Sequence, residues 1–129
     1  MDLTVYFKSI VDSDPTRVIV CDLNHTIIYM NPAASRFYEN RGVHLLGGSL
    51  LDCHSDDSND KIKAAVKWFG ESRDNNRLFT FYNQKENKDV YMIALRDEKG
   101  TLIGYYEKHE YRTPETAEPY VSGGESILN

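Results

Sequence analysis

The adjacent residues Cys53 and His54 are the part of the sequence best suited to chemistry. A thiol beside an imidazole can ligate a metal, act as an activated nucleophile or bind haem. The other histidines, His25, His44 and His109, stand at no spacing from this pair that is typical of metal ligands. We expect the thiol to pack as a small apolar side chain and the imidazole to precede a helix cap, and we predict no metal site. Haem ligation by His54 is the alternative.

Other groupings of reactive side chains give no support for catalysis. The sequence shows no Ser-His-Asp arrangement and no acid pair of catalytic type. We therefore expect that the protein is not an enzyme, and an enzyme with Cys53 as nucleophile and His54 as base is the alternative. One acidic cluster lacks the spacing and the turn glycine of a calcium loop, so we expect it to favour the positive end of a helix: Asp52, Asp56, Asp57 and Asp60.

The spacing of apolar residues predicts the elements that position these groups. The expected order is a helix, a hairpin of two strands, a helix that begins with Pro32, a long helix and three further strands. Short connections allow only antiparallel neighbours among the last three strands. The sequence therefore predicts an α+β fold with a five-stranded antiparallel sheet and helices on one face. In chain order the elements cover residues 3–11, 17–30, 32–40, 57–71, 77–82, 89–95 and 102–111.

Length and composition limit the function classes. The chain has 129 residues, a net charge of −5 and 40% hydrophobic residues, as expected for a single globular domain. The acidic balance argues against nucleic acid as a partner. No apolar run approaches the ~18 residues of a membrane helix, and the first residues do not resemble a signal peptide. We expect a cytoplasmic protein that has no membrane partner and whose two cysteines are free thiols.

Four short motifs occur in an order that resembles the PAS (Per-Arnt-Sim) family of sensory domains. They are Asp22 with Asn24 in the first hairpin, residues 28–34 (IYMNPAA), residues 46–49 (LGGS), and residues 96–100 (RDEKG) followed by Gly104. The resemblance covers about residues 15–112, which leaves residues 1–14 as an N-terminal helix and residues 113–129 as a C-terminal tail. It implies a bacterial-type sensor or regulator that binds a small ligand or mediates association. No output domain is present in the chain, so a separate signalling protein is an expected partner.

The resemblance also bears on cofactors, whose identity the sequence leaves open. The flavin-binding branch of the family needs a cysteine where this chain has Leu50, so we do not expect flavin. The haem-binding branch takes its ligand from a histidine on the long helix, where this chain has Ile62. Haem would therefore need His54 or Cys53 instead.

Alternating strand residues predict a pocket between the sheet and residues 31–71. In the family, the strand before the last hairpin turns alternate residues inward, which implies Val90, Met92 and Ala94 here. On the closing strand it implies Leu102, Gly104 and Tyr106. We expect a small apolar or aromatic ligand with one polar group met by His54 or Tyr106, and plain core packing is the alternative. The predicted pocket residues are Ile19, Cys21, Phe37, Cys53, His54, Phe79, Phe81, Met92, Gly104 and Tyr106.

Apolar residues outside this pocket predict a homodimer. The N-terminal helix carries an apolar stripe that it cannot bury alone, and outward positions of the strands are too apolar for solvent. The predicted interface residues are Leu3, Phe7, Ile10, Val11, Tyr91, Ile93 and Tyr105, with Leu78, Tyr82 and Ile103 on the same sheet face. Apolar anchors such as Tyr120 and Ile127 predict that the tail docks onto a neighbouring chain.

Overall fold

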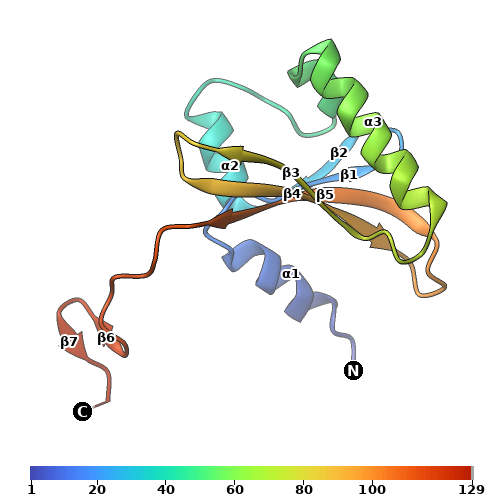
Figure 1. The fold of residues 1–129 in the computed structure, drawn as a ribbon. Helices are drawn as coiled ribbons and strands as arrows, with labels where there is room; N and C mark the ends of the chain where they lie inside the picture. Colours follow the sequence, from blue (N-terminus) through green and yellow to red (C-terminus); the bar gives the residue numbers. More distant parts are fainter. Residues whose placement is uncertain (129) are drawn as a thin grey trace.

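A five-stranded antiparallel sheet forms the centre of the molecule, as the sequence predicts. The computed structural model describes residues 1–128. The strand order is β2-β1-β5-β4-β3, and α3 crosses one face of the sheet while α1 lies on the other side (Figure 1). In chain order the elements are α1 (Thr4–Ser13), β1 (Ile19–Asp22), β2 (Ile27–Met30), α2 (Pro32–Glu39), a short 3-10 helix η1 (Leu50–Cys53), α3 (Asp56–Glu71), β3 (Arg77–Asn83), β4 (Lys88–Arg96), β5 (Leu102–Tyr111), β6 (Val121–Ser122) and β7 (Glu125–Ser126).

Asn31 joins three elements where β2 ends. Its side chain is fully buried, and its Oδ1 accepts hydrogen bonds from the backbone amides of Val18 and Ala34 at 2.9 and 3.0 Å. The second bond caps α2, which has Pro32 at its first turn. Its Nδ2 donates to three carbonyl oxygens between α1 and β1, those of Val11, Asp14 and Thr16. The same amide therefore fixes the end of α1, the start of β1 and the start of α2.

The long helix α3 is held against the inner face of the sheet by packing and by one arginine. Ser55 caps its first turn, and Ile62, Ala65 and Phe69 are its buried residues. At the other end the Arg96 guanidinium of β4 donates to backbone carbonyl oxygens in and just after the last turn: Phe69 at 2.7 Å, Ser72 at 3.1 Å and Asn75 at 3.3 Å. These bonds satisfy carbonyl groups that a helix end leaves free.

An extra residue in β5 changes which side chains face inward. Leu95 pairs with Gly104, but the next residue of β4, Arg96, pairs with Leu102, so Ile103 has no partner. Beyond this bulge Tyr105 is buried in the core at 1% exposure, which turns Gly104 and Tyr106 to the outer face. The alternation predicted for the closing strand is therefore wrong by one residue.

Close approach of two strands explains why position 104 is glycine. A Cβ atom there would lie 2.2 Å from the Cys21 backbone carbonyl oxygen in β1. The missing side chain thus leaves room for a neighbouring backbone and not for a ligand.

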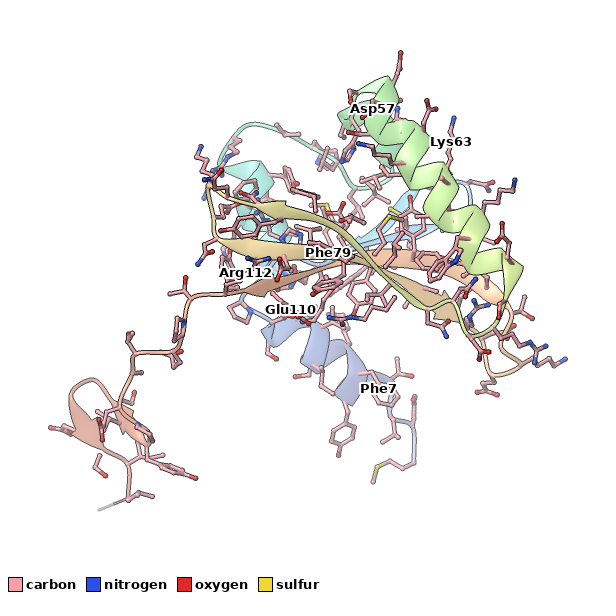
Figure 2. The ribbon with its side chains drawn as sticks, in the orientation of Figure 1. Phe7, Asp57, Lys63, Phe79, Glu110 and Arg112 are labelled. Atoms are coloured by element: carbon pink, nitrogen blue, oxygen red, sulfur yellow. The ribbon has the colours of Figure 1, made fainter. Side chains whose placement is uncertain are left out.

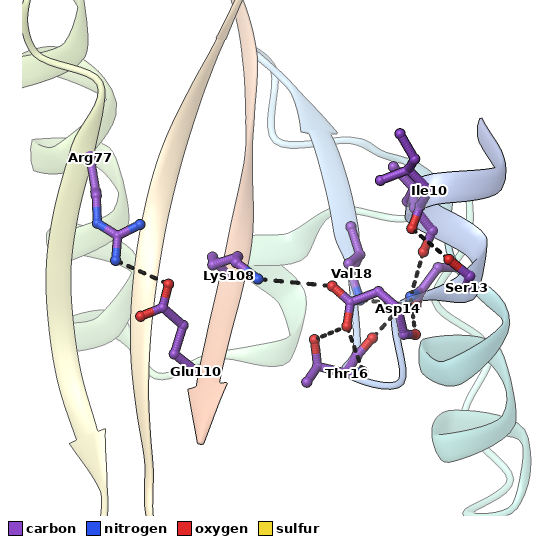
Figure 3. A network of polar contacts seen from close by, with 10 residues as sticks. Ile10, Ser13, Asp14, Thr16, Val18, Arg77, Lys108 and Glu110 are labelled. Atoms are coloured by element: carbon purple, nitrogen blue, oxygen red, sulfur yellow. Dashed lines mark hydrogen bonds and ion pairs between the residues drawn. The ribbon is translucent and has the colours of Figure 1, made fainter. Parts of the chain in front are cut away.

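The outer sheet face carries ion pairs, and α1 lies beside it. Arg77 of β3 pairs with Glu110 of β5 at 3.1 Å, and Lys108 pairs with Asp14 at 3.9 Å (Figure 3). No residue of α1 is buried. The helix is attached mainly through its last turn, where the Tyr29 hydroxyl donates to Asp12.

The C-terminal tail leaves the domain in an extended path and ends in the small β6–β7 hairpin (Figure 1). Every described residue from 113 to 128 is exposed, so the single chain offers the tail no dock of its own. Docking onto a neighbouring chain stays a prediction. Among residues 1–128, no helix is long and apolar enough to cross a membrane.

Candidate functional site

A cleft of about 560 Å³ opens between α3 and the β3–β4 edge of the sheet. One side is formed by α3 residues at helical spacing, Lys61, Ala65 and Trp68, and the other by residues of β3 and β4. The lining is mainly apolar and aromatic. The site therefore combines an apolar volume with a few polar groups, which is typical of small-molecule sites.

Four of the ten predicted pocket residues line this cleft, namely His54, Phe79, Phe81 and Met92. Phe79 also lies against Tyr91, with ring centroids 5.5 Å apart. Thr80 interrupts the register between the two phenylalanines, because its neighbours Phe79 and Phe81 pair with adjacent residues of β4. This bulge brings consecutive residues of the edge strand into contact with the cleft.

The remaining predicted pocket residues lie outside the cleft. Ile19 and Cys21 belong to the packed core. Gly104 and Tyr106 face outward because of the bulge in β5. Cys53 is exposed and does not line the cleft.

Phe37 is held by two arginines and does not line the cleft. The guanidinium carbons of Arg17 and Arg41 lie 3.8 and 3.6 Å from its ring centroid. Arg17 in turn pairs with Glu86, which also pairs with the buried ammonium of Lys88 at 2.9 Å. Side chains thus fill the region beside α2, and the cleft is restricted to the α3 side.

Cys53 and His54 differ in their suitability for chemistry. Partial burial, with a smaller contribution from Asp52, raises the pKa of the Cys53 thiol. This is opposite to the change that activates a cysteine. The His54 Nδ1 lies 2.9 Å from the Leu50 carbonyl oxygen, which can only accept, so Nδ1 carries a proton. In the neutral imidazole, Nε2 is then a free acceptor beside the cleft.

A second set of titratable side chains lies in and beside the core: Tyr105, Cys21 and His25. Tyr105, predicted as an interface residue, is buried, and its hydroxyl shares a hydrogen bond of 2.7 Å with His25 Nδ1. Burial raises the pKa of Cys21 to about 11 and also raises the pKa of Tyr105. Burial, together with the positive charge of Lys63, lowers the pKa of His25. These groups form a neutral polar cluster at neutral pH.

Sequence reasoning missed Glu107, the one carboxylate among the cleft residues. It lies on β5 opposite Met92 and has 28% of its side chain exposed. Among residues 1–128 its carboxylate receives no hydrogen bond from the protein, and its one ion-pair contact is with His109, whose Nε2 lies 3.6 Å away and which is charged only when protonated. Its inward position follows from Tyr105 by simple alternation, so knowledge of the β5 bulge would have revealed it.

Most predicted interface residues are accessible. Leu3, Phe7 and Ile10 of the N-terminal segment are exposed. Figure 2 places Phe7 on the side of the sheet opposite Asp57 and Lys63 of α3. The corrections are Tyr105, which is buried because of the bulge, and Leu78, which packs against the core because its partner in β4 is the buried Met92.

Metal ligation finds no support in the described part of the chain. No group of three or more histidine, cysteine, aspartate or glutamate side chains there is arranged to hold a metal ion. Within the acidic cluster, Asp56 and Asp57 lie in the first turn of α3, where acidic side chains were predicted to favour the positive end of the helix.

Solved structures similar to this one decide the fold. The PAS domain of a protein from Colwellia psychrerythraea matches with a TM-score of 0.60 at 14% identity, over 85% of this chain and 97% of that one. The PAS domain of BvgS from Bordetella pertussis matches with a TM-score of 0.56 at 17% identity, over 88% and 89% of the two chains. This chain has the PAS fold. The resemblance predicted from the sequence is thereby confirmed at the level of fold.

A third PAS structure extends the comparison to a sensor with a bound group. The Aer2 receptor from Vibrio cholerae, described as a dual PAS-haem oxygen sensor, matches with a TM-score of 0.53 at 18% identity, over 76% and 95% of the two chains. No family model matches the sequence. No curated protein matches it either. The PAS fold is thus established by three-dimensional similarity, at identities too low to assign a ligand.

Proposed function

We propose that this PAS-fold chain is a sensory or signalling module that binds a small, mostly apolar or aromatic molecule in the cleft and acts through protein association. The observation that carries the proposal is the cleft itself. Its volume of about 560 Å³ lies in the range of small-molecule sites, and Trp68, Phe81 and Met92 give it an apolar lining.

A molecule in the cleft would bridge two elements that otherwise meet along a limited surface. It would contact α3 on one side and the edge strand β3 on the other. Bound ligand therefore favours one position of α3 relative to the sheet, and this differential affinity is what a ligand needs to shift a conformational equilibrium.

Association is the proposed output, through the exposed apolar stripe of α1 and the outer sheet face. Phe7 and Ile10 are 59% and 67% exposed, although they are large apolar residues on one helix. A second copy of the chain is the proposed partner, because α1 buries none of its residues within one chain. A separate signalling protein would then recognise the dimer.

Native mass spectrometry of freshly purified protein tests ligand binding directly. We expect a bound mass that is lost from Ala64→Phe, because Ala64 lines the cleft and a ring there fills it. The matched control is Lys63→Phe, which adds the same ring to α3 on the flank near His25. Retention of the bound mass by the Ala64 variant would place the ligand elsewhere. Absence of any bound mass from the wild-type protein, together with unchanged dimer formation by both variants, favours a ligand-free dimerisation module.

Haem is a second candidate occupant, favoured by one observation. The bond from Nδ1 to the Leu50 carbonyl leaves the His54 Nε2 free at the cleft, as an iron ligand requires. Protein expressed with added haem should then show a strong absorbance band in the blue that His54→Ala removes. A colourless protein, or a band unaffected by that substitution, contradicts haem ligation by His54.

We further propose that the protein is not an enzyme that uses Cys53 as a nucleophile. The raised pKa of the thiol supports this view, because the thiolate is the reactive form. The rate of iodoacetamide labelling of Cys53 should rise with pH around or above the ordinary thiol pKa of about 8.5. A midpoint well below that value would restore the nucleophile hypothesis.

A further inference from the structure

We infer that the cleft selects a ligand that joins a positively charged amine to a small apolar or aromatic body, with the Glu107 carboxylate as the anchor for the amine. The inference rests on the proposed function, since it names the chemical class of the molecule bound in the same cleft. It rests on a carboxylate that receives no hydrogen bond from the protein, on lining donors that the protein already uses, and on surroundings that accept an organic cation.

Glu107 is placed as an anchor, and its one ion-pair contact, with His109, depends on protonation of that imidazole. It lies on the inner face of a central strand, opposite the buried Met92, where a charged side chain is unfavourable without a partner. The Nε2 atom of His109 is 3.6 Å from its carboxylate, beyond hydrogen-bond distance, and carries charge only when the imidazole is protonated. Among residues 1–128 no donor forms a hydrogen bond with Glu107, so the carboxylate remains open to one from a ligand.

Three of the donors that line the cleft are already used by the protein. The Thr80 hydroxyl donates to the Val90 carbonyl at 2.9 Å, and the Lys61 ammonium pairs with Asp57 at 3.0 Å. The His54 Nδ1 proton is directed to Leu50. The Ser58 hydroxyl and the Trp68 indole N–H keep some donor capacity, but the charged group that receives no hydrogen bond is the Glu107 carboxylate, so a complementary ligand brings a donor to it.

The aromatic side chains of the cleft can bind an organic cation as well as an uncharged apolar molecule. Trp68, Phe79 and Phe81 line the same cleft, and the face of an aromatic ring attracts a nearby ammonium group. An anionic ligand would meet the opposite situation, because Glu107 repels it and the only lysine in the lining, Lys61, has 77% of its side chain exposed and is paired. The net charge of −5 also favours the approach of a cation.

Three probes of similar shape and different charge test the inference by isothermal titration calorimetry. The probes are 2-phenylethylamine, 2-phenylethanol and phenylacetate. We expect the amine to bind about tenfold more tightly than the alcohol, because a charge-assisted hydrogen bond replaces a neutral one. We expect the carboxylate probe to bind most weakly.

Glu107→Gln provides the matched variant, since it keeps the shape of the side chain and removes its charge. It should bring the affinity for 2-phenylethylamine down to that for 2-phenylethanol and leave the alcohol unchanged. The control is Glu110→Gln, which removes the same charge from the outer face of the same strand, where Glu110 pairs with Arg77. The control should retain the preference for the amine.

The outcomes separate the two proposals. Equal binding of amine and alcohol by the wild-type protein, or a preference that survives in the Glu107 variant, overturns the amine inference and leaves the binding function standing. Failure of all three probes to bind contradicts the binding function for this size of ligand and the inference with it. The ranking of the probes by the wild-type protein decides the matter even where the variant does not fold.

Discussion

At the scale of single residues, Asn31 holds three elements together through one side chain. One buried amide group contacts five backbone groups of three segments: its oxygen accepts two hydrogen bonds, and its two N–H groups are shared among three carbonyl oxygens. Without the amide, the buried Val18 and Ala34 N–H groups lose their acceptor, and the Val11 carbonyl keeps only its long bond from the Asp14 N–H. The effect is therefore expected to exceed that of an ordinary helix cap.

We predict that Asn31→Ala lowers the free energy of unfolding by about 3 kcal/mol, more than the typical ~1 kcal/mol for loss of a helix cap. Urea titration followed by circular dichroism measures the change. Asn40→Ala, at the exposed end of the same helix, serves as control and should change stability by less than about 0.5 kcal/mol. Similar losses in both variants would show that the buried network is not what stabilises this corner.

His25 makes the stability of the domain depend on pH. Its pKa is lowered in the folded state, first by burial and then by the charge of Lys63. On acidification the unfolded chain therefore binds a proton before the folded one does. The contribution of neutral His25 is complete above its ordinary pKa of about 6.5 and is lost as the pH falls through the folded-state value.

We predict that urea midpoints of the wild-type protein fall between about pH 7 and about pH 5, and that His25→Asn reduces this fall. Asparagine is chosen because it tolerates the positive φ of 64° at this position. Lys63→Met should reduce the fall by a smaller amount, because it removes the secondary cause only. A pH dependence that is identical in wild type and His25→Asn would assign the effect to other groups.

At the scale of elements, two glycines in different environments should respond to alanine with opposite signs. The Cβ atom added at Gly104 would meet the Cys21 carbonyl oxygen at 2.2 Å, whereas a Cβ atom at Gly70, near the end of α3, meets nothing within 4 Å. The first substitution forces β1 and β5 apart, and the second only lowers the entropy of the unfolded helix segment.

We predict that Gly104→Ala destabilises the protein by about 3 kcal/mol or abolishes folding, and that Gly70→Ala stabilises it by about 0.5–1 kcal/mol. Thermal denaturation by calorimetry measures both. A Gly104 variant of wild-type stability would mean that the two strands can separate easily, and the assignment of the inner and outer faces of β5 would then need revision.

The sequence predicted where the helices and strands lie better than it predicted which side chains of a strand point inward. Pro32 and the cap predicted after His54 marked the starts of α2 and α3, because capping is a local interaction. The inward residues of β4 also followed from alternation. On β5 one extra residue, Ile103, reversed every face beyond it, and nothing local in the sequence marks a bulge that depends on pairing with β4.

The site residues could be predicted only where they did not depend on the faces of β5, which the sequence assigned wrongly. Phe79, Phe81 and Met92 were placed at the cleft from strand alternation, and His54 from its position just before the long helix. Glu107 was missed because of the reversed faces. Phe37 was misplaced for another reason, since its two arginine partners come from other parts of the chain and their packing is a tertiary effect.

At the scale of the whole molecule, the property to be measured is the equilibrium between monomer and dimer. The apolar residues of α1 are exposed in the single chain, and the tail also presents Tyr120, Ile127 and Leu128 to solvent. Burial of such residues between two copies is favourable and depends on concentration. Dimer formation, tail docking and a cytoplasmic location stay predictions.

We predict that sedimentation velocity at micromolar concentration shows a dimer and that Phe7→Glu raises its dissociation constant at least about tenfold, because a charge would have to be desolvated. Ser9→Glu introduces the same charge on the opposite side of α1 and should have little effect. A monomeric wild-type protein, or equal effects of the two substitutions, would exclude α1 as the interface.

The attachment of α1 by its last turn gives the helix the properties of a lever arm. Asn31 holds the Val11 carbonyl and Tyr29 holds Asp12, while the preceding residues of the helix bury nothing. The seven residues of α1 before Val11 extend about 10 Å from this fulcrum, so a rotation of about 20° displaces the free end by about 4 Å. The same amide that forms the fulcrum also caps α2, so a sub-ångström shift inside the domain is magnified at the far end of the helix.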